Sequence, residues 1–385
     1  MNPHPPVDRI LPSDEAYALL ELTRELADAE LAPRAADFEE RGEFPREVLR
    51  TLGRAGLLGL PYPEEYGGGG QPYEVYLQVL EELARRWLAV AEGVSVHTLA
   101  CYPTAAYGTD AQRKRFLPDL LGGDLLGAYC LSEPAGGSDP AAMTTRALRD
   151  GDDFVVTGTK AWITHAGHAD FYNVFARTGG PGSHGISCLL ADAATAGITP
   201  LRPERTMGLR ASPVSQIAFD GALIPAERLL GDENGGFRIA MSALDGGRLG
   251  IAACAVGLAQ AALDHAAAYA REREQFGRPI MQFQGLAFML ADMATQISAA
   301  RALTLAAARL RDAGRPYSVE AAKAKLFATD MAMRVTTDAV QVLGGYGYVA
   351  DHPVERYMRE AKVLQIVEGT NQIQRVVIAR ALGKA

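Results

Sequence analysis

A glutamate at the end of an apolar segment is the residue in this chain best suited to proton transfer. Glu368 follows the run 364–367, Leu-Gln-Ile-Val, and precedes Gly369. Burial raises the pKa of a carboxyl and so brings a candidate base toward neutral pH. The alternative is an exposed charge beside the last helix, which Thr370 can cap and which runs to about residue 382. Taken alone, this segment leaves both interpretations open.

Three further segments have compositions that suit a flat or anionic ligand. Residues 129–139 are rich in Gly, Ala and Ser, which lets backbone amides approach a ligand closely while hydroxyls donate to it. Residues 160–164, Lys-Ala-Trp-Ile-Thr, can place an indole against a ring and a hydroxyl at the edge of that ring. Residues 271–280 carry arginines that can hold a pyrophosphate. The structural alternatives are a plain turn, a core tryptophan and a solvated helix end.

The composition indicates a folded protein and excludes several classes. The chain has 385 residues, of which 48% are hydrophobic and 22% charged, so two or three domains with their own cores are expected. A net charge of -8 disfavours binding to nucleic acid or to an anionic membrane by general charge. The four cysteines lack metal-like spacing, which predicts reduced, buried thiols and no metal site. Without an apolar leader or membrane-length segment, we expect a soluble cytoplasmic protein, and the Ala-, Gly- and Arg-rich composition suits a bacterium.

The hydrophobic period changes twice along the chain. Helical spacing comes first, then short β-branched and aromatic runs bounded by Gly, Pro and Asp, then an Ala-rich helical pattern. These zones predict an α+β multidomain protein with an N-terminal helical domain (1–126), a middle antiparallel β domain (127–236) and a C-terminal helical bundle of the four-helix type (237–385). The strands are joined without helices, and no Gly-x-Gly-x-x-Gly follows a strand, which argues against a nicotinamide-binding domain.

Five motifs in this order resemble the acyl-CoA dehydrogenase family. They are C-L-S-E-P-A-G-G-S-D, K-A-W-I-T, E-R-E-Q-F-G-R-P-I, Q-V-L-G-G-Y-G and V-E-G-T-N-Q-I-Q-R, and the resemblance extends from about Ser13 to Leu382. It implies non-covalent FAD and oxidation of an acyl-CoA thioester to trans-2-enoyl-CoA, with electrons passed to an electron-transferring flavoprotein. It also implies a homotetramer built as a dimer of dimers.

The resemblance assigns roles to individual residues. Glu368 matches the catalytic base, and the position that some members use instead, Gly247 in Leu-Asp-Gly-Gly-Arg, carries no carboxyl here. Expected cofactor contacts are Tyr129, Leu131, Ser132, Gly137, Ser138, Trp162, Ile163, Thr164, Arg273, Gln275, Phe276, Phe283, Gln284, Gln341, Gly344, Gly345, Thr370 and Gln372. Those from Arg273 to Gly345 are expected to reach the FAD of a neighbouring subunit. Expected substrate contacts are Ser138, Ser183, Asp245, Arg248 and Gly369.

One departure from the family pattern concerns the acyl pocket. Val367 stands where the family often has an aromatic residue, which favours a shorter or branched acyl chain. Chain length, branching and pathway stay open. The alternative functions are an acyl-CoA oxidase or another flavin enzyme on the same fold, and a non-enzymatic binding module. DNA-binding relatives belong to that last class, and the acidic balance disfavours them.

Overall fold

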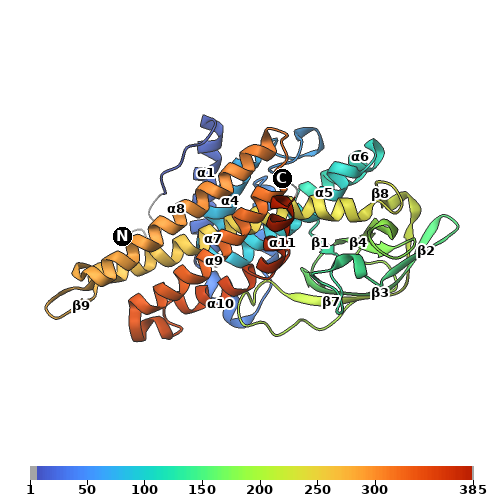
Figure 1. The fold of residues 1–385 in the computed structure, drawn as a ribbon. Helices are drawn as coiled ribbons and strands as arrows, with labels where there is room; N and C mark the ends of the chain where they lie inside the picture. The colour runs from blue at the N-terminus through green and yellow to red at the C-terminus, as the bar shows by residue number, and fades with distance from the viewer. Residues whose placement is uncertain (1–6, 384–385) are drawn as a thin grey trace.

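Two helical regions pack together, and a β-sheet region lies at one end of them (Figure 1). The structure is a computed structural model that describes residues 7–383. Helices occupy both the N-terminal and the C-terminal parts of the chain, and strands occupy the part between them. The predicted helix–β–helix order is therefore confirmed.

Side chains at the preceding residue cap the first turns of two of the N-terminal helices, the first and the last. These helices are α1 (Asp14–Leu26), α2 (Ala35–Arg41), α3 (Arg46–Arg54), α4 (Tyr73–Arg86), α5 (Leu88–Tyr107) and α6 (Asp110–Leu121), with a π-helical turn at Ala27–Leu31. Ser13 accepts a hydrogen bond from the amide of Ala16 at the start of α1, and Thr109 and Gln112 form a capping box at the start of α6. Such bonds satisfy amides that a first helical turn leaves without partners. Helices α4 and α5 are buried along nearly their whole length and form the centre of this region.

The middle region is one mixed β-sheet. Its strands are β1 (Gly127–Cys130), β2 (Arg146–Asp150), β3 (Asp153–Thr164), β4 (Phe171–Arg177), β5 (Ile186–Asp192), β6 (Ile198–Pro200), β7 (Val214–Pro225) and β8 (Leu229–Leu230). The order is β6-β7-β3-β2-β4-β5-β8, and β1 pairs with β4. Most pairs are antiparallel as predicted, but β1 runs parallel to β4, and β2 meets β4 in parallel at one position. The expectation of a purely antiparallel sheet is thus corrected, because turn composition reports only on strands adjacent in sequence.

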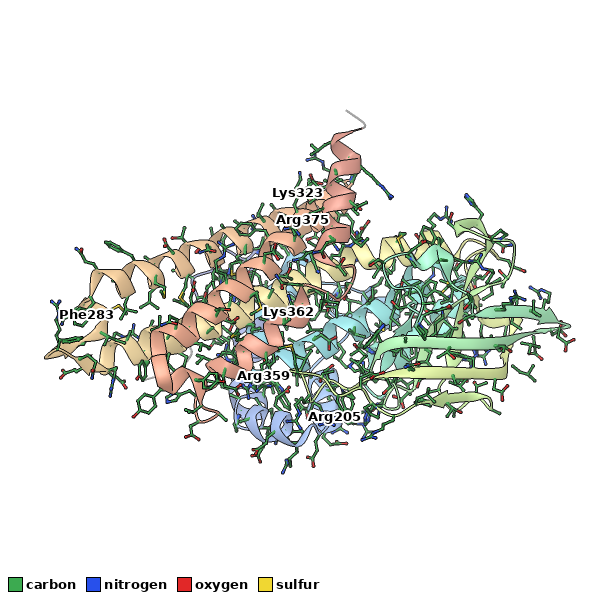
Figure 2. All side chains as sticks on the ribbon, turned by 60° about the horizontal axis from the view of Figure 1, so that its bottom comes forward. Arg205, Phe283, Lys323, Arg359, Lys362 and Arg375 are labelled. Carbon is green, nitrogen blue, oxygen red and sulfur yellow. The ribbon has the colours of Figure 1, made fainter. Side chains whose placement is uncertain are left out.

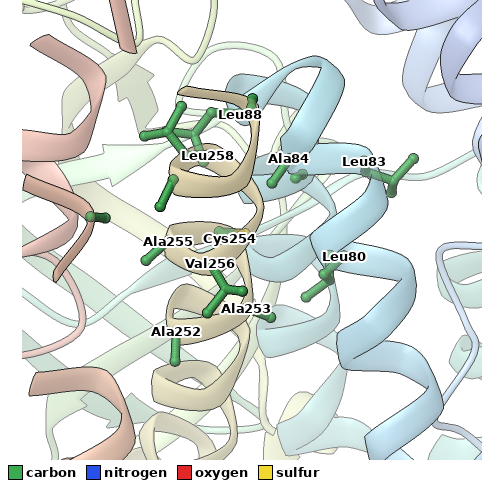
Figure 3. Packing of buried hydrophobic residues seen from close by; sticks show 14 of the residues in the cluster. Leu80, Leu83, Ala84, Leu88, Ala252, Ala253, Cys254, Ala255, Val256 and Leu258 are labelled. Carbon is green, nitrogen blue, oxygen red and sulfur yellow. The ribbon is translucent and has the colours of Figure 1, made fainter. Parts of the chain in front are cut away.

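The C-terminal helices pack on α4 and α5 through small residues. They are α7 (Gly236–Glu272), α8 (Gln284–Asp312), α9 (Ser318–Leu343), α10 (Val354–Leu364) and α11 (Asn371–Leu382), and a hairpin of β9 (Glu274–Gln275) and β10 (Arg278–Pro279) joins α7 to α8. Figure 3 shows Leu80 and Ala84 of α4 on the side of that helix that faces α7, which carries Ala252, Ala253 and Val256 there. A Cβ added at Gly257 would lie 2.3 Å from the carbonyl oxygen of Glu81, so this close approach requires glycine.

Helix α7 is the longest element, and several other helices pack around it. It has 37 residues and is apolar enough to cross a membrane by length and composition alone. However, 67% of its most apolar stretch is buried inside the fold, where α4, α5, α8 and α9 surround it. Its apolar character is therefore that of a core helix.

Candidate active site

Glu368 lies in the turn between α10 and α11, in a left-handed backbone conformation with φ of 53°. Both carboxyl oxygens are shielded from solvent and have no hydrogen-bond partner within residues 7–383. Burial, and next the charge of Glu92, raises the pKa of Glu368 to about 8, although Lys325 and Arg248 act in the opposite direction. An exposed charge at a helix start is therefore the wrong interpretation of this residue.

The carboxylate of Glu368 lies directly over a glycine of α7. A Cβ built on Gly247 would be 2.0 Å from Oε2 and 2.7 Å from the carboxyl carbon. Only a residue without a side chain leaves the carboxylate in this place. The two positions that the motif resemblance offers for the base therefore meet at one point in this structure.

The turn that carries Glu368 is fastened from its backbone side. The ammonium of Lys325 donates to the carbonyl of Gly369 at 3.0 Å and to Oδ1 of Asn371 at 2.9 Å. The side-chain amide of Gln374 donates to the same carbonyl at 2.7 Å. Burial lowers the pKa of Lys325 to about 7, while Glu368 opposes this shift. These bonds hold the backbone of the turn and leave the carboxylate of Glu368 uncommitted.

Two other predicted substrate contacts flank Gly247 on α7. The carboxylate of Asp245 accepts from Arg248 at 2.7 Å and from the Ser318 hydroxyl at 2.9 Å. Burial raises the pKa of Asp245 although Arg248 opposes it. Arg248 also lowers the pKa of Glu368, so the structure brings these residues together beside the base.

The glycine-rich turn at 131–139 is joined to the segment 160–164 by a buried ion pair. Lys160 donates to Glu133 at 3.0 Å, and Glu133 also accepts from the amides of Thr144 and Thr145 at 2.7 and 2.9 Å. Burial by itself would raise the pKa of Glu133, but Lys160 and these hydrogen bonds hold it at about 2. The turn is therefore a fixed platform. Sequence reasoning quoted both charged residues within motifs but gave them no role.

The segment 162–164 alternates between exposure and burial. Trp162 is 65% exposed and has φ of 62°, whereas Ile163 is 1% exposed and belongs to the β core. The core-tryptophan alternative is thus wrong for Trp162, whose indole is available to a ligand. The hydroxyl of Thr164 donates to Glu92 at 3.3 Å.

Glu92 is a functional candidate that sequence reasoning missed. It lies on α5, is 3% exposed, and accepts from the hydroxyl of Ser212 at 2.7 Å as well as from Thr164. Burial raises its pKa to about 7 although both hydroxyls oppose this. The signal that could have found it is a lone carboxylate inside an apolar helical run, residues 88–101.

A second group of predicted cofactor contacts meets at the β9–β10 hairpin. Phe276 at its tip is 94% exposed with φ of 53°. Most members of this group line one open cavity of about 840 Å³. The lining includes Arg273, Gln275, Phe276, Phe283, Gln341, Gly344 and Gly345. Gln284 is exposed beside it on α8 and is not part of that lining.

The hairpin and the β domain lie at opposite ends of the molecule. The hairpin tip and Phe283 mark one end, and the strands that carry Trp162 form the other (Figures 1 and 2). The structure therefore brings the predicted cofactor contacts together in two separate groups.

The remaining predicted residues take varied positions. The hydroxyl of Tyr129 donates to the carbonyl of Ala240 at 3.2 Å. Leu131 is buried, and Ser132 is partly buried, with its backbone carbonyl accepting from the amide of Ala161 at 2.9 Å. Gly137, Ser138 and Gln372 are exposed, Ser183 is partly buried before β5, and Thr370 caps α11 by accepting from the amide of Ile373 at 3.3 Å.

Comparisons with known proteins match all three regions of the chain. The N-terminal, middle and C-terminal domain models of acyl-CoA dehydrogenases match residues 13–124, 128–222 and 234–383. The chain is 43% identical to a short-chain specific acyl-CoA dehydrogenase of Clostridium acetobutylicum over 95% of this chain and 97% of that protein.

Solved structures show the same fold. Butyryl-CoA dehydrogenase of Megasphaera elsdenii is 42% identical, with a TM-score of 0.95 over 98% of this chain and all (100%) of that chain. A structure described as the electron transferring flavoprotein of Acidaminococcus fermentans, studied for flavin-based electron bifurcation, contains a chain 43% identical with a TM-score of 0.96, covering 98% of this chain and 100% of that one. This protein therefore belongs to the acyl-CoA dehydrogenase family of oxidoreductases.

Proposed function

We propose that the protein oxidises an acyl-CoA thioester to the trans-2-enoyl-CoA, with Glu368 as the base that removes the α-proton. The observation that carries the proposal is a buried carboxyl without a hydrogen-bond partner, placed over a glycine. A carboxyl with a pKa near 8 is a stronger base than an exposed one and suits proton abstraction close to neutral pH. The same shielding keeps water from a reacting thioester.

The backbone of the same turn supplies a hydrogen-bond donor for the substrate. Removal of the α-proton places negative charge on the thioester carbonyl oxygen. The amide of Glu368 has no acceptor within residues 7–383, so it is free to donate to that oxygen. One such donor contributes about 3–4 kcal/mol to catalysis in other enzymes.

The residues present fit FAD as the cofactor. The exposed indole of Trp162 offers its face to a flat ring, and the hydroxyl of Thr164 can meet the edge of that ring. The fixed turn at 131–139 offers backbone donors. Arginine and glutamine side chains with exposed aromatic rings line the hairpin cavity, which suits a dinucleotide. When bound, FAD supplies the acceptor for the β-hydride.

The separation of these two groups supports an oligomer. One FAD cannot contact both ends of the same chain, but the hairpin of a neighbouring subunit can bring the second group to the first. This arrangement agrees with the homotetramer, built as a dimer of dimers, that the motifs imply. Pairing of two subunits would also cover Phe276, whose exposure is costly for an isolated chain.

The acyl chain and the electron acceptor follow from the relatives. Short-chain specificity of the Clostridium acetobutylicum enzyme and the butyryl-CoA dehydrogenase fold favour a short acyl group, and Val367 agrees with this. The likeness to a chain from the electron transferring flavoprotein structure supports an electron-transferring flavoprotein as acceptor. The bacterial relatives support a bacterial cytoplasmic setting.

Anaerobic titration of the holoenzyme with short acyl-CoA thioesters tests the reaction. The flavin absorbance should bleach near one equivalent of substrate in the wild type and stay intact in Glu368→Gln, which retains FAD and binds the thioester. Full turnover by Glu368→Gln would refute the assignment. Rapid oxygen consumption during turnover would favour an oxidase instead, because a dehydrogenase passes its electrons to a protein acceptor.

A further inference from the structure

Glu92 is a buried carboxylate whose two oxygens meet hydroxyl groups and no cation. One oxygen accepts from Thr164 at 3.3 Å and the other from Ser212 at 2.7 Å. No lysine or arginine within residues 7–383 forms an ion pair with it, whereas the ion pair of Glu133 with Lys160 shows the usual compensation of a buried carboxylate. Shielding an ionised carboxylate without a cation is costly, so this arrangement indicates a role beyond packing.

The two hydroxyls that contact this carboxylate lie on segments that are joined to each other. The backbone amide of His165, the residue after Thr164, donates to the carbonyl of Pro213, the residue after Ser212, at 3.1 Å. His165 is fully buried, and a Cβ added at Gly93 of α5 would lie 3.0 Å from its Nε2. Helix α5 therefore packs closely against the end of β3, and the carboxylate and both hydroxyls are preformed as one unit.

The carboxylate decides which part of the Thr164 hydroxyl a ligand meets. A hydroxyl has one hydrogen and two lone pairs, and an ionised carboxylate can only accept. The hydrogen of Thr164 is therefore committed to Glu92, and lone pairs remain for a ligand. Thr164 is only partly buried and follows the exposed Trp162 by two residues, so its oxygen can still be reached. Without Glu92 the same hydroxyl could rotate and donate to the ligand.

We propose that Glu92 is a positioning residue, which makes the Thr164 hydroxyl a hydrogen-bond acceptor toward the flavin ring and so favours the reduced ring. This inference rests on the proposed function, in which that hydroxyl meets the edge of the ring. When the ring takes the β-hydride, a nitrogen at its edge changes from an acceptor into an N–H donor. A lone pair of Thr164 can accept from this N–H, whereas a hydroxyl hydrogen would favour the oxidised ring.

The charge of Glu92 acts in the opposite direction to its hydrogen bond. A negative charge near the ring disfavours the reduced form, which carries two more electrons. The experiment must therefore separate the two effects. Glu92→Met removes the charge and the acceptor, and Thr164→Val removes the hydroxyl while keeping the shape of the side chain. The effect of the charge is present with Thr164 or with valine at that position, so it cancels when the two changes are compared.

The midpoint potential of the bound flavin is the readout, measured without substrate against a reference redox dye. The measurement is made at about pH 8.5, where Glu92, whose burial raises its pKa to about 7, is ionised. We expect the change caused by Glu92→Met to be more negative in the presence of Thr164 than in the Thr164→Val background. The difference should equal about 5- to 10-fold in relative affinity for reduced over oxidised flavin, which is roughly 20–30 mV for a two-electron couple.

Ser212→Ala is the matched control, because it removes the other hydroxyl bonded to Glu92 but keeps the charge and the bond to Thr164. Its potential should stay within about threefold of the wild type in the same relative affinity, or roughly 15 mV. A change of the same size in both Thr164 backgrounds would show that Glu92 acts by charge alone. That result, or a difference of the opposite sign, would overturn the role of Glu92.

Failure of this inference can be told apart from failure of the proposed function. If the wild type binds FAD and short acyl-CoA thioesters bleach it, the proposed function stands whatever the potentials show. If FAD does not bind, or no thioester bleaches it, the proposed function itself fails and the role of Glu92 fails with it. Should Glu92→Met not fold, Glu92→Leu provides a second apolar variant for the same comparison.

Discussion

Substitution of Gly247 by alanine should abolish most turnover without destabilising the protein. The added methyl group would lie 2.0 Å from Oε2 of Glu368, whereas Cβ atoms essentially never approach another heavy atom within 3.0 Å. The carboxylate must therefore move by about 1 Å, a displacement that can cost about 100-fold in rate. Alanine at the same time favours the helical conformation of α7 over glycine by up to about 1 kcal/mol.

The assay combines single-turnover flavin reduction with thermal unfolding of the holoenzyme. We expect Gly247→Ala to reduce flavin about 100-fold more slowly and to keep its Tm and FAD content. Gly250→Ala is the matched control, because it lies one turn further along α7 and its methyl group meets the Ser95 hydroxyl, a side-chain end that can rotate. Wild-type reduction rates in Gly247→Ala would show that Glu368 does not work from the position seen here, which would refute the reasoning.

Three further outcomes follow from the structure. Glu92→Gln removes a negative charge that raises the pKa of Glu368, so the acid-side fall in kcat/KM should move to lower pH by about one unit. Lys325→Met removes a positive charge that lowers this pKa, so the same limb should move to higher pH by a similar amount; shifts of the same sign in both variants would contradict this account. Thr109→Ala breaks the capping box with Gln112 and should cost about 1 kcal/mol in unfolding free energy, with kcat/KM unchanged in steady-state assays.

The order of the elements could be predicted from the sequence because hydrophobic period is a local property. The cap at Thr370 was also within reach, since it lies in a short segment with its own capping residue. The parallel pairing of β1 with β4 was not, because the partners are 44 residues apart in the register that joins Gly127 to Phe171. Long-range pairing depends on how the whole sheet is assembled.

The candidate site shows the same division. Glu368 and Trp162 could be identified from motifs. The burial of the Glu368 carboxyl and the exposure of Trp162 could not be predicted, because each depends on packing between regions. Glu92 contacts Thr164 and Ser212, which are 72 and 120 residues away in sequence. Short-range patterns carry no information about such contacts.

Two buried glutamates show how this fold sets the basicity of its active-site carboxyl. Burial by itself raises the pKa of Glu81, yet the charges and hydrogen bonds of Arg9 and Arg301 bring it down to about 2. Glu368 is shielded to a similar degree but has no hydrogen-bond partner, and its pKa is about 8. Lys325, whose charge lowers this pKa, donates its hydrogen bonds to the carbonyl of Gly369 and to Oδ1 of Asn371. A direct ion pair with the carboxylate would have fixed the turn equally well but would have made Glu368 as weak a base as Glu81. Anchoring the backbone and leaving the carboxylate free is therefore what the proposed proton abstraction by Glu368 requires.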